Sequence, residues 1–301
     1  MAKTDIITLD LNFQHSLNAI ACYLIKHSTG AVLVECGPGS TQEELTAGLA
    51  RNGLGLSDVT HVLLTHIHLD HAGAAGWMAR HGAQIFVHPV GAPHLISPDR
   101  LLASAARIYG DRMNELWGDF LPVPESQVTV PRDRQEIAIG NLRFVPLDTP
   151  GHAEHHYAYL FEDTCFSGDV GGVRIRPHPY LRIPMPPPEL DLQKWRRSVA
   201  HLRGQALHRI APTHFGIHED PMWHLQAVER CLDEAESWLG HAMAGHPGIE
   251  ELRAAFTEWM SGQGAAQDLP AQALRAYEFA NPPGMSADGL FRYWNKVRLA
   301  T

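Results

Sequence analysis

Cysteine is scarce in this sequence. The 301 residues include four cysteines, Cys22, Cys36, Cys165 and Cys231, which are widely spread and form no Cys-x-x-Cys pair. This number and spacing exclude a disulfide framework and a zinc knuckle. Three of the four lie in apolar, strand-like stretches, as expected for reduced residues of a core.

Basic charge is also low. Lys and Arg total 24 against 33 Asp and Glu, and the formal net charge is −9. Nucleic acids and anionic membranes attract basic surfaces, so we expect neither as a partner. An anionic substrate remains compatible with this balance, because bound dications would dominate the local field.

Long apolar runs are missing as well, and the sequence starts with polar residues. No run approaches the length of a transmembrane helix, and the polar start, residues 1–5, lacks the apolar region of a secretory signal. We therefore expect a cytoplasmic protein that acts on a small molecule, and a homo-oligomer is compatible with the sequence. A Gly-x-Ser-x-Gly element is absent too, which disfavours a serine hydrolase.

Histidine, in contrast, is abundant, with 20 residues. Segment 65–71 reads Thr-His-Ile-His-Leu-Asp-His and follows a short apolar run that is typical of a buried strand. In a turn after such a strand, His66 and His68 can bind one metal while Asp70 and His71 bind a second. The alternative is an ordinary polar turn in a His-rich chain, but this motif in this setting is uncommon and favours a metal site.

Three further candidates, His152, Asp169 and His214, each follow a strand-like stretch. Taken alone, each is a weak candidate, because a single His at a strand end is more often a hydrogen-bonded turn residue than a ligand. Side chains at the same end of several strands converge in space, however, so their shared position is the argument for a common site. Imidazole nitrogen and carboxylate oxygen suit hard-to-borderline dications. Two such metals need about three ligands each plus a shared carboxylate, and the seven candidates meet that need.

The order of the predicted elements indicates an α/β fold. Strands and helices alternate in both halves, which predicts an αββα sandwich of two mixed β-sheets flanked by helices. The predicted strands are 6–11, 19–26, 31–35, 60–65, 84–87, three within 128–146, 157–161, 164–167 and 206–211. The predicted helices among them are 41–53, 72–80, 98–117 and 191–203.

From residue 221 onward the pattern is helical. The predicted helices there are 221–245, 247–261, 271–279 and 286–299. We therefore expect a catalytic domain over 1–218 and a C-terminal α-helical subdomain, or cap, over 219–301.

With these motifs the sequence resembles the metallo-β-lactamase-fold hydrolase superfamily, in particular its glyoxalase II-like and lactonase-like branches. The resemblance implies two divalent metal ions, most readily zinc, with iron or manganese compatible. It implies a first site of His66, His68 and His152, a second site of Asp70, His71 and His214, and a bridging Asp169.

The implied activity is hydrolysis of a small ester, thioester or lactone. A metal-bridging hydroxide would attack the carbonyl, and the second metal would stabilise the oxyanion. Asp70 is the expected catalytic residue, which would orient the hydroxide and then carry a proton to the leaving group.

Three positions refine the resemblance. Asp169 stands where many true β-lactamases of this fold carry Cys, which disfavours antibiotic hydrolysis. His68 stands where the oxygen-reducing diiron members carry a carboxylate. Glu35 replaces an Asp that supports the site in many relatives, and a plain surface position is the alternative for this residue.

The sequence says less about the substrate than about the metal ligands. Loop 171–188 would overhang the metals, so Arg174, together with Arg176 and Arg182, could clamp a carboxylate. His178 and Tyr180 could add polar contacts, while solvated loop cations and loop packing are the alternatives. Near the C-terminus we find no match to the basic glutathione-binding residues of glyoxalase II.

Other functions are weighed against hydrolysis. They are a persulfide dioxygenase with one iron, a phosphodiesterase or nuclease, and a non-catalytic binding protein. The complete second-metal set argues against the dioxygenase, and the acidic charge balance argues against the nuclease. The intact ligand set argues against a non-catalytic protein, although fold alone does not decide function.

Overall fold

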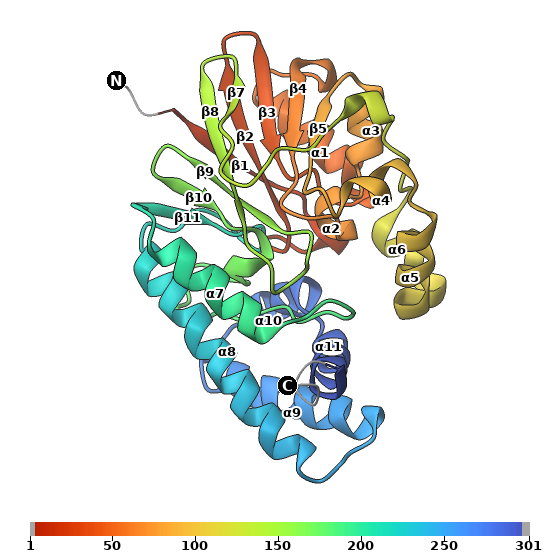
Figure 1. The fold of residues 1–301 in the computed structure, drawn as a ribbon, viewed down its shortest axis with the longest axis vertical. Helices are drawn as coiled ribbons and strands as arrows, with labels where there is room; N and C mark the ends of the chain where they lie inside the picture. The colour runs from red at the N-terminus through yellow and green to blue at the C-terminus, as the bar shows by residue number, and fades with distance from the viewer. Residues whose placement is uncertain (1–3, 297–301) are drawn as a thin grey trace.

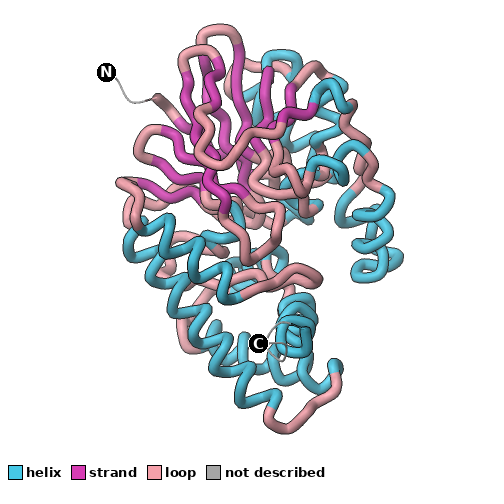
Figure 2. Tube along the Cα trace, viewed as in Figure 1, coloured by secondary structure: helices cyan, strands magenta, loops and turns pink. Residues whose placement is uncertain are grey.

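The computed structural model describes residues 4–296, which form two β-sheets that face each other (Figures 1 and 2). In the first sheet β1 to β3 are antiparallel and β3 to β6 are parallel. Its strands, in spatial order, are β1 (Ile6–Asp10), β2 (Ala21–His27), β3 (Gly30–Val34), β4 (Val59–Leu63), β5 (Gln84–Phe86) and β6 (Val128–Thr129).

The second sheet is antiparallel except for its β10–β11 pair, which is parallel. Its strands, in spatial order, are β11 (Arg209–Ala211), β10 (Thr164–Phe166), β9 (Tyr157–Phe161), β8 (Leu142–Asp148) and β7 (Ile137–Ile139). Both sheets are therefore mixed, and the predicted αββα sandwich is confirmed.

Helices flank the sheets and extend below them (Figure 1). In chain order they are α1 (Gln42–Arg51), α2 (Leu69–Ala72), α3 (Ala75–Arg80), α4 (Ala92–Ile96), α5 (Asp99–Tyr109), α6 (Met113–Trp117), α7 (Leu192–Arg203), α8 (Pro221–Met243), α9 (Ile249–Ala265), α10 (Ala271–Ala280) and α11 (Pro283–Lys296). Within residues 4–296, none of these helices has both the length and the apolar character that a bilayer crossing requires.

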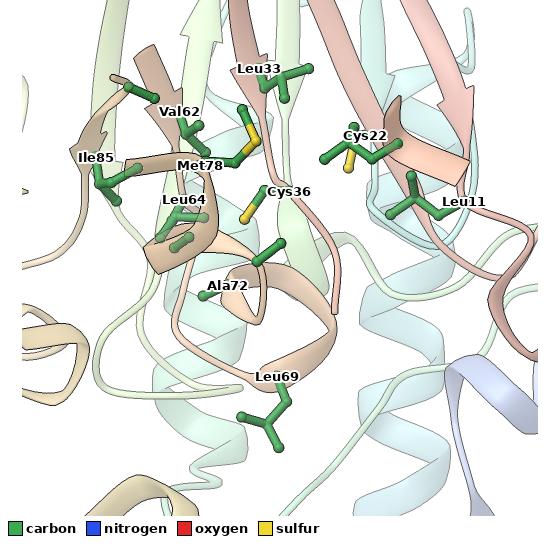
Figure 3. Close-up of a cluster of buried hydrophobic side chains, with 14 of the residues drawn as sticks. Leu11, Cys22, Leu33, Cys36, Val62, Leu64, Leu69, Ala72, Met78 and Ile85 are labelled. Atoms are coloured by element: carbon green, nitrogen blue, oxygen red, sulfur yellow. The ribbon is translucent and has the colours of Figure 1, made fainter. Parts of the chain in front are cut away.

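The apolar run of residues 62–64, at the end of β4, is buried on both faces of the sheet. Leu63 belongs to the core between the two sheets, whereas Val62 and Leu64 belong to the core between the first sheet and its helices. Successive strand residues point to opposite faces, so a strand with both faces covered is apolar throughout. Figure 3 shows Val62 and Leu64 packed with Cys36 and Met78 on the helical side. This double burial fixes the end of β4, where the His-rich turn begins.

Two predicted helices differ from the observed ones. The predicted helix 98–117 is interrupted at Gly110, which has φ 53° and separates α5 from a short 3₁₀ turn that leads into α6. A glycine adopts that left-handed conformation without a Cβ clash, so it overrides the apolar periodicity of the segment. The predicted helix 72–80 is two helices, and α2 already begins at Leu69, inside the metal-binding motif.

The C-terminal helices share a core with the second sheet. Trp195 of α7, Leu225 of α8, Phe256 of α9 and Leu290 of α11 belong to one buried cluster, which also includes Cys165 of β10. The predicted boundary at 218 stays a prediction. The last helix was predicted over 286–299 and begins at Pro283 in the structure. Residues 297–299 of that prediction lie outside the described residues.

Candidate metal centre

The turn after β4 is held by both sheets. The carbonyl of Thr65 accepts a hydrogen bond from the Tyr157 amide at 2.7 Å, and the carbonyl of Leu64 accepts one from the Tyr159 hydroxyl at 3.2 Å. His68 is extended and forms the N-cap of α2, so Asp70 and the following histidine lie in the first turn of a helix. The change from strand to helix turns neighbouring side chains in different directions, as the motif predicted.

The first group of converging atoms comes from three histidines. The Nε2 of His66 lies 2.9 Å from the Nδ1 of His68, and the Nε2 of His152 lies 3.0 Å from that same Nδ1. Tetrahedral nitrogens about 2.05 Å from a zinc ion would be about 3.3 Å apart, close to these spacings. The Nδ1–H of His152 donates to the Pro184 carbonyl at 2.9 Å, which directs the Nε2 lone pair toward the other two rings.

The second group is Asp70, His71 and His214, which also bring one ligand atom each within 4.8 Å of one another. The Nδ1–H of His71 donates to Glu35 at 2.9 Å, and the Nδ1–H of His214 donates to the Ala19 carbonyl at 2.7 Å. Both Nε2 atoms therefore face inward, toward the other donors of the site. Asp70 Oδ2 lies 3.6 Å from His71 Nε2 and 3.4 Å from His214 Nε2.

Asp169 lies between the two groups. Its Oδ1 is 3.2 Å from His71 Nε2 and 3.3 Å from His214 Nε2, while its Oδ2 is 3.3 Å from His152 Nε2. The residue belongs to a short 3₁₀ helix, Gly168–Gly171, directly after β10. One carboxylate thus presents one oxygen to each group.

The donor atoms are placed to bind a cation and are poorly placed to hydrogen-bond to one another. His71 Nε2, His214 Nε2 and Asp169 Oδ1 are buried without a well-aligned hydrogen-bond partner in the described part of the chain. A buried polar atom left unpaired costs about 1–3 kcal/mol, so three of them at one point call for a ligand. Imidazole nitrogen with carboxylate oxygen is the donor set of a borderline dication.

The electrostatics differ between the two groups. Burial, followed by the neighbouring His152, lowers the pKa of His68 to about 3, so that imidazole is neutral and its lone pair is available. Burial also lowers the pKa of His214, but the Asp169 and Asp70 carboxylates together outweigh burial, and the pKa rises to about 10. The second group therefore attracts positive charge, which a metal ion would supply.

Glu35 supports the second group through hydrogen bonds. It is fully buried, its Oε1 accepts hydrogen bonds from His71 Nδ1 and from the hydroxyl groups of Thr65 and Thr213, and its Oε2 accepts one from the Thr65 amide. The surface alternative for Glu35 is wrong. Its carboxylate holds the ring of His71 in the orientation that presents Nε2 to the site.

We expect Glu35→Gln to weaken metal binding by about 10- to 100-fold, the usual effect of removing a carboxylate partner from a metal-binding histidine. Competition with a chromophoric chelator measures the change in metal affinity. Glu35→Asp is the matched control, since it retains the charge with a shorter side chain, and we expect it to recover most of the affinity. Equal affinities for wild type and Glu35→Gln would contradict this role.

A family model described as the Metallo-beta-lactamase superfamily matches residues 16–214. The chain belongs to this superfamily. The match ends at His214, so it contains all seven candidate ligands and leaves out the C-terminal helices.

Solved structures of the superfamily share the fold. A metallo-beta-lactamase family protein of Thermus thermophilus superposes with a TM-score of 0.64 at 22% identity, covering 97% of this chain and 93% of that one. An archaeal metallo-beta-lactamase superfamily protein of Sulfolobus tokodaii superposes with a TM-score of 0.62 at 19% identity, covering 76% and 86%. At these identities the likeness concerns the fold alone.

Curated relatives match mostly over part of their length. A metallo-beta-lactamase fold-containing protein of Sulfurisphaera tokodaii is 28% identical over 148 residues, 48% of this chain and 56% of the relative. An atrochrysone carboxyl ACP thioesterase of Aspergillus fumigatus is 28% identical over 160 residues, which cover 52% of this chain and 41% of the relative. A probable metallo-hydrolase of Bacillus subtilis is 23% identical over 257 residues, 78% of each. The chain thus spans about half the length of the first two.

A cavity of about 1000 Å³ opens onto the candidate metal centre of this superfamily member. The candidate ligands that line it are His68, Asp70, His152 and Asp169. Its walls come from α5, α6, α10, the start of α11 and the segment 184–189. Sequence reasoning missed these wall residues, because apolar side chains on helices give the same pattern whether they line a cavity or a core.

The structure does not bring the three expected substrate residues to this cavity. Arg174 forms a two-pronged ion pair with Asp220, at 2.7 and 2.8 Å, and stacks over Trp223. Tyr180 is buried and accepts a hydrogen bond from Arg182, while His178 lies partly exposed on the loop. None of the three is among the residues that line the cavity.

For Arg174 we expect a stabilising role instead of a substrate contact. Arg174→Ala should lower the free energy of unfolding by about 2 kcal/mol, since charge-assisted hydrogen bonds contribute about 1.5–3 kcal/mol. Urea denaturation measures this loss, and Asp220→Asn should reproduce most of it. An increase in KM with unchanged stability would instead restore the substrate-clamp hypothesis.

Proposed function

We propose that this protein is a dinuclear metal-dependent hydrolase that cleaves an ester, thioester or lactone. This proposal rests mainly on the position of Asp169. Its two carboxylate oxygens face two separate groups of donor atoms, and each group has three further side chains. A single carboxylate in that position is what a bridged pair of ions needs. The Aspergillus fumigatus relative is named as a thioesterase, which supports the acyl class.

The residues of the two groups have distinct roles in this proposal. His66, His68 and His152 would hold one ion, Asp70, His71 and His214 the other, and Asp169 would bridge. Zinc suits these donors best, with iron or manganese as alternatives. When bound, such a pair supplies hydroxide at neutral pH and polarises the carbonyl.

Asp70 is the proposed proton carrier. Its Oδ2 faces His71 and His214, which leaves Oδ1 to accept a proton and return it to the leaving group. The two imidazoles keep the carboxylate ionised: burial raises the pKa of Asp70, but His71 and His214 outweigh that effect and lower it to about 2. Its side chain is 21% exposed and lines the cavity, so a substrate can reach it.

The complete second group favours hydrolysis over the persulfide dioxygenase alternative, which needs one iron. A panel of thioesters, lactones and phosphodiesters, tested on metal-analysed protein, distinguishes the candidates. We expect about two metals per chain and turnover of thioesters or lactones. One metal per chain with oxygen uptake on persulfide, or turnover of phosphodiesters alone, would refute the proposal.

A further inference from the structure

We propose that the substrate carries a large apolar acyl group, which binds against an aromatic wall formed by Phe13, Tyr109, Trp117 and Phe279. This inference rests on the proposed hydrolase function and adds the class of acyl group to it. The size of the cavity, the construction of the wall and one exposed apolar side chain on α5 support it independently of one another.

The cavity is far larger than a small acyl group requires. Its volume of about 1000 Å³ lies at the upper end of the roughly 300–1000 Å³ found for drug-sized ligands. It is continuous with the metal centre, because Asp70 and Asp169 line the same space as Leu101, Ile108 and Leu274. A carbonyl at the metals would therefore place its acyl substituent between the helices.

The aromatic wall joins three distant parts of the chain. Phe13, after β1, stacks on Trp117 of α6 with centroids 5.5 Å apart and meets Phe279 of α10 edge-on at 5.9 Å. Tyr109 of α5 meets Trp117 edge-on at 5.0 Å, and its hydroxyl donates to the Met285 sulfur at 3.2 Å. Such interlocked rings form a rigid surface, which binds flat apolar groups with little loss of side-chain entropy.

Helix α5 presents one side to the cavity. The residues of α5 that line it recur at helical spacing, namely Arg100, Leu101, Ser104, Ala105, Ile108 and Tyr109. Ile108 is 42% exposed, one of few large apolar side chains left so open in residues 4–296. An isoleucine facing a cavity gains from an apolar ligand that covers it, at about 25 cal/mol per Å² buried.

Several charges of the lining already have partners. Arg253 pairs with Asp288 at 2.6 Å, and the Arg275 guanidinium lies 5.5 Å from the centroid of the Phe279 ring. Arg100 lies exposed at the start of α5. An apolar acyl group can therefore occupy the aromatic side of the cavity without displacing water from isolated buried charges.

The test compares acetyl and 2-naphthoyl thioesters of the same thiol on the metal-loaded enzyme. We expect kcat/KM to be at least about a hundredfold higher for the naphthoyl substrate, since each buried methylene is worth about fourfold. In Ile108→Gln the naphthoyl-to-acetyl ratio should fall about tenfold. Met222→Gln, at an equally exposed apolar position of α8 outside the cavity, is the matched control and should leave the ratio unchanged.

Binding of 2-naphthoate, measured by calorimetry, gives a readout that does not depend on turnover. We expect binding with a negative heat-capacity change, weakened in Ile108→Gln and unaltered in Met222→Gln. Equal kcat/KM for both thioesters, or no binding of 2-naphthoate, would overturn the inference while leaving hydrolysis standing. Naphthoate binding without hydrolysis of any ester, thioester or lactone would instead overturn the proposed function.

Discussion

Asp169→Asn is expected to reduce kcat/KM by at least about a thousandfold, because the loss of a mere partner of a ligand already costs about 10- to 100-fold. The substitution preserves the shape of the side chain and removes its charge. His71 and His214 would then face an amide, and neither group of donors would keep its shared anion. Steady-state kinetics and elemental analysis measure the two effects, and we expect the metal content to fall below two per chain.

A surface aspartate provides the control for this substitution. Asp233 of α8 pairs with Arg196 of α7, and the aspartate side chain is 71% exposed. Exposed pairs contribute about 0–1 kcal/mol, so Asp233→Asn should alter neither metal content nor rate. Full activity of Asp169→Asn with two bound metals would contradict a bridging role.

Removal of metal by a strong chelator is expected to abolish activity and to lower Tm by about 8 °C. Ions present at about a thousand times Kd stabilise a fold by about 4 kcal/mol, and each kcal/mol corresponds to about 2 °C in a chain of this size. The physical cause is the set of donors described above, since buried atoms of His71, His214 and Asp169 have no well-aligned hydrogen-bond partner among the described residues. Calorimetry and an activity assay measure both changes.

Zinc added back should restore activity and Tm together. Asp169→Asn is the matched control in this experiment as well, because a protein that already binds less metal should show a smaller change in Tm with chelator. Unchanged activity after complete removal of metal would refute the metal-dependent mechanism itself.

The convergence of the candidate ligands was predictable from the sequence because strand order constrains it. His66, His152 and His214 lie far apart in the chain, yet each follows a buried strand, and the sheets bring those strand ends together. Gly110 was a weak point of the predicted helix 98–117, since glycine disfavours a helix interior, but the apolar spacing on either side of it favoured one continuous helix. One left-handed glycine outweighed that periodicity.

The cavity wall was not predictable for a different reason. Trp117 and Phe279 have the spacing of core residues, and they do contact other rings. Only the three-dimensional arrangement shows that one side of this cluster borders open space. For Arg174 the reverse holds, because sequence shows a cation beside a proposed site but cannot show that Asp220 pairs with it.

The aromatic wall has an evolutionary consequence. The candidate ligands all fall within the matched residues 16–214, whereas Phe279 lies beyond them and Trp117 lies in the helical excursion between β5 and β6. Under the two proposals above, reaction chemistry and substrate preference would reside in separate parts of the chain. Exchange of the helical excursion or the C-terminal helices between superfamily members would then transfer a preference for acyl groups to an unchanged candidate centre.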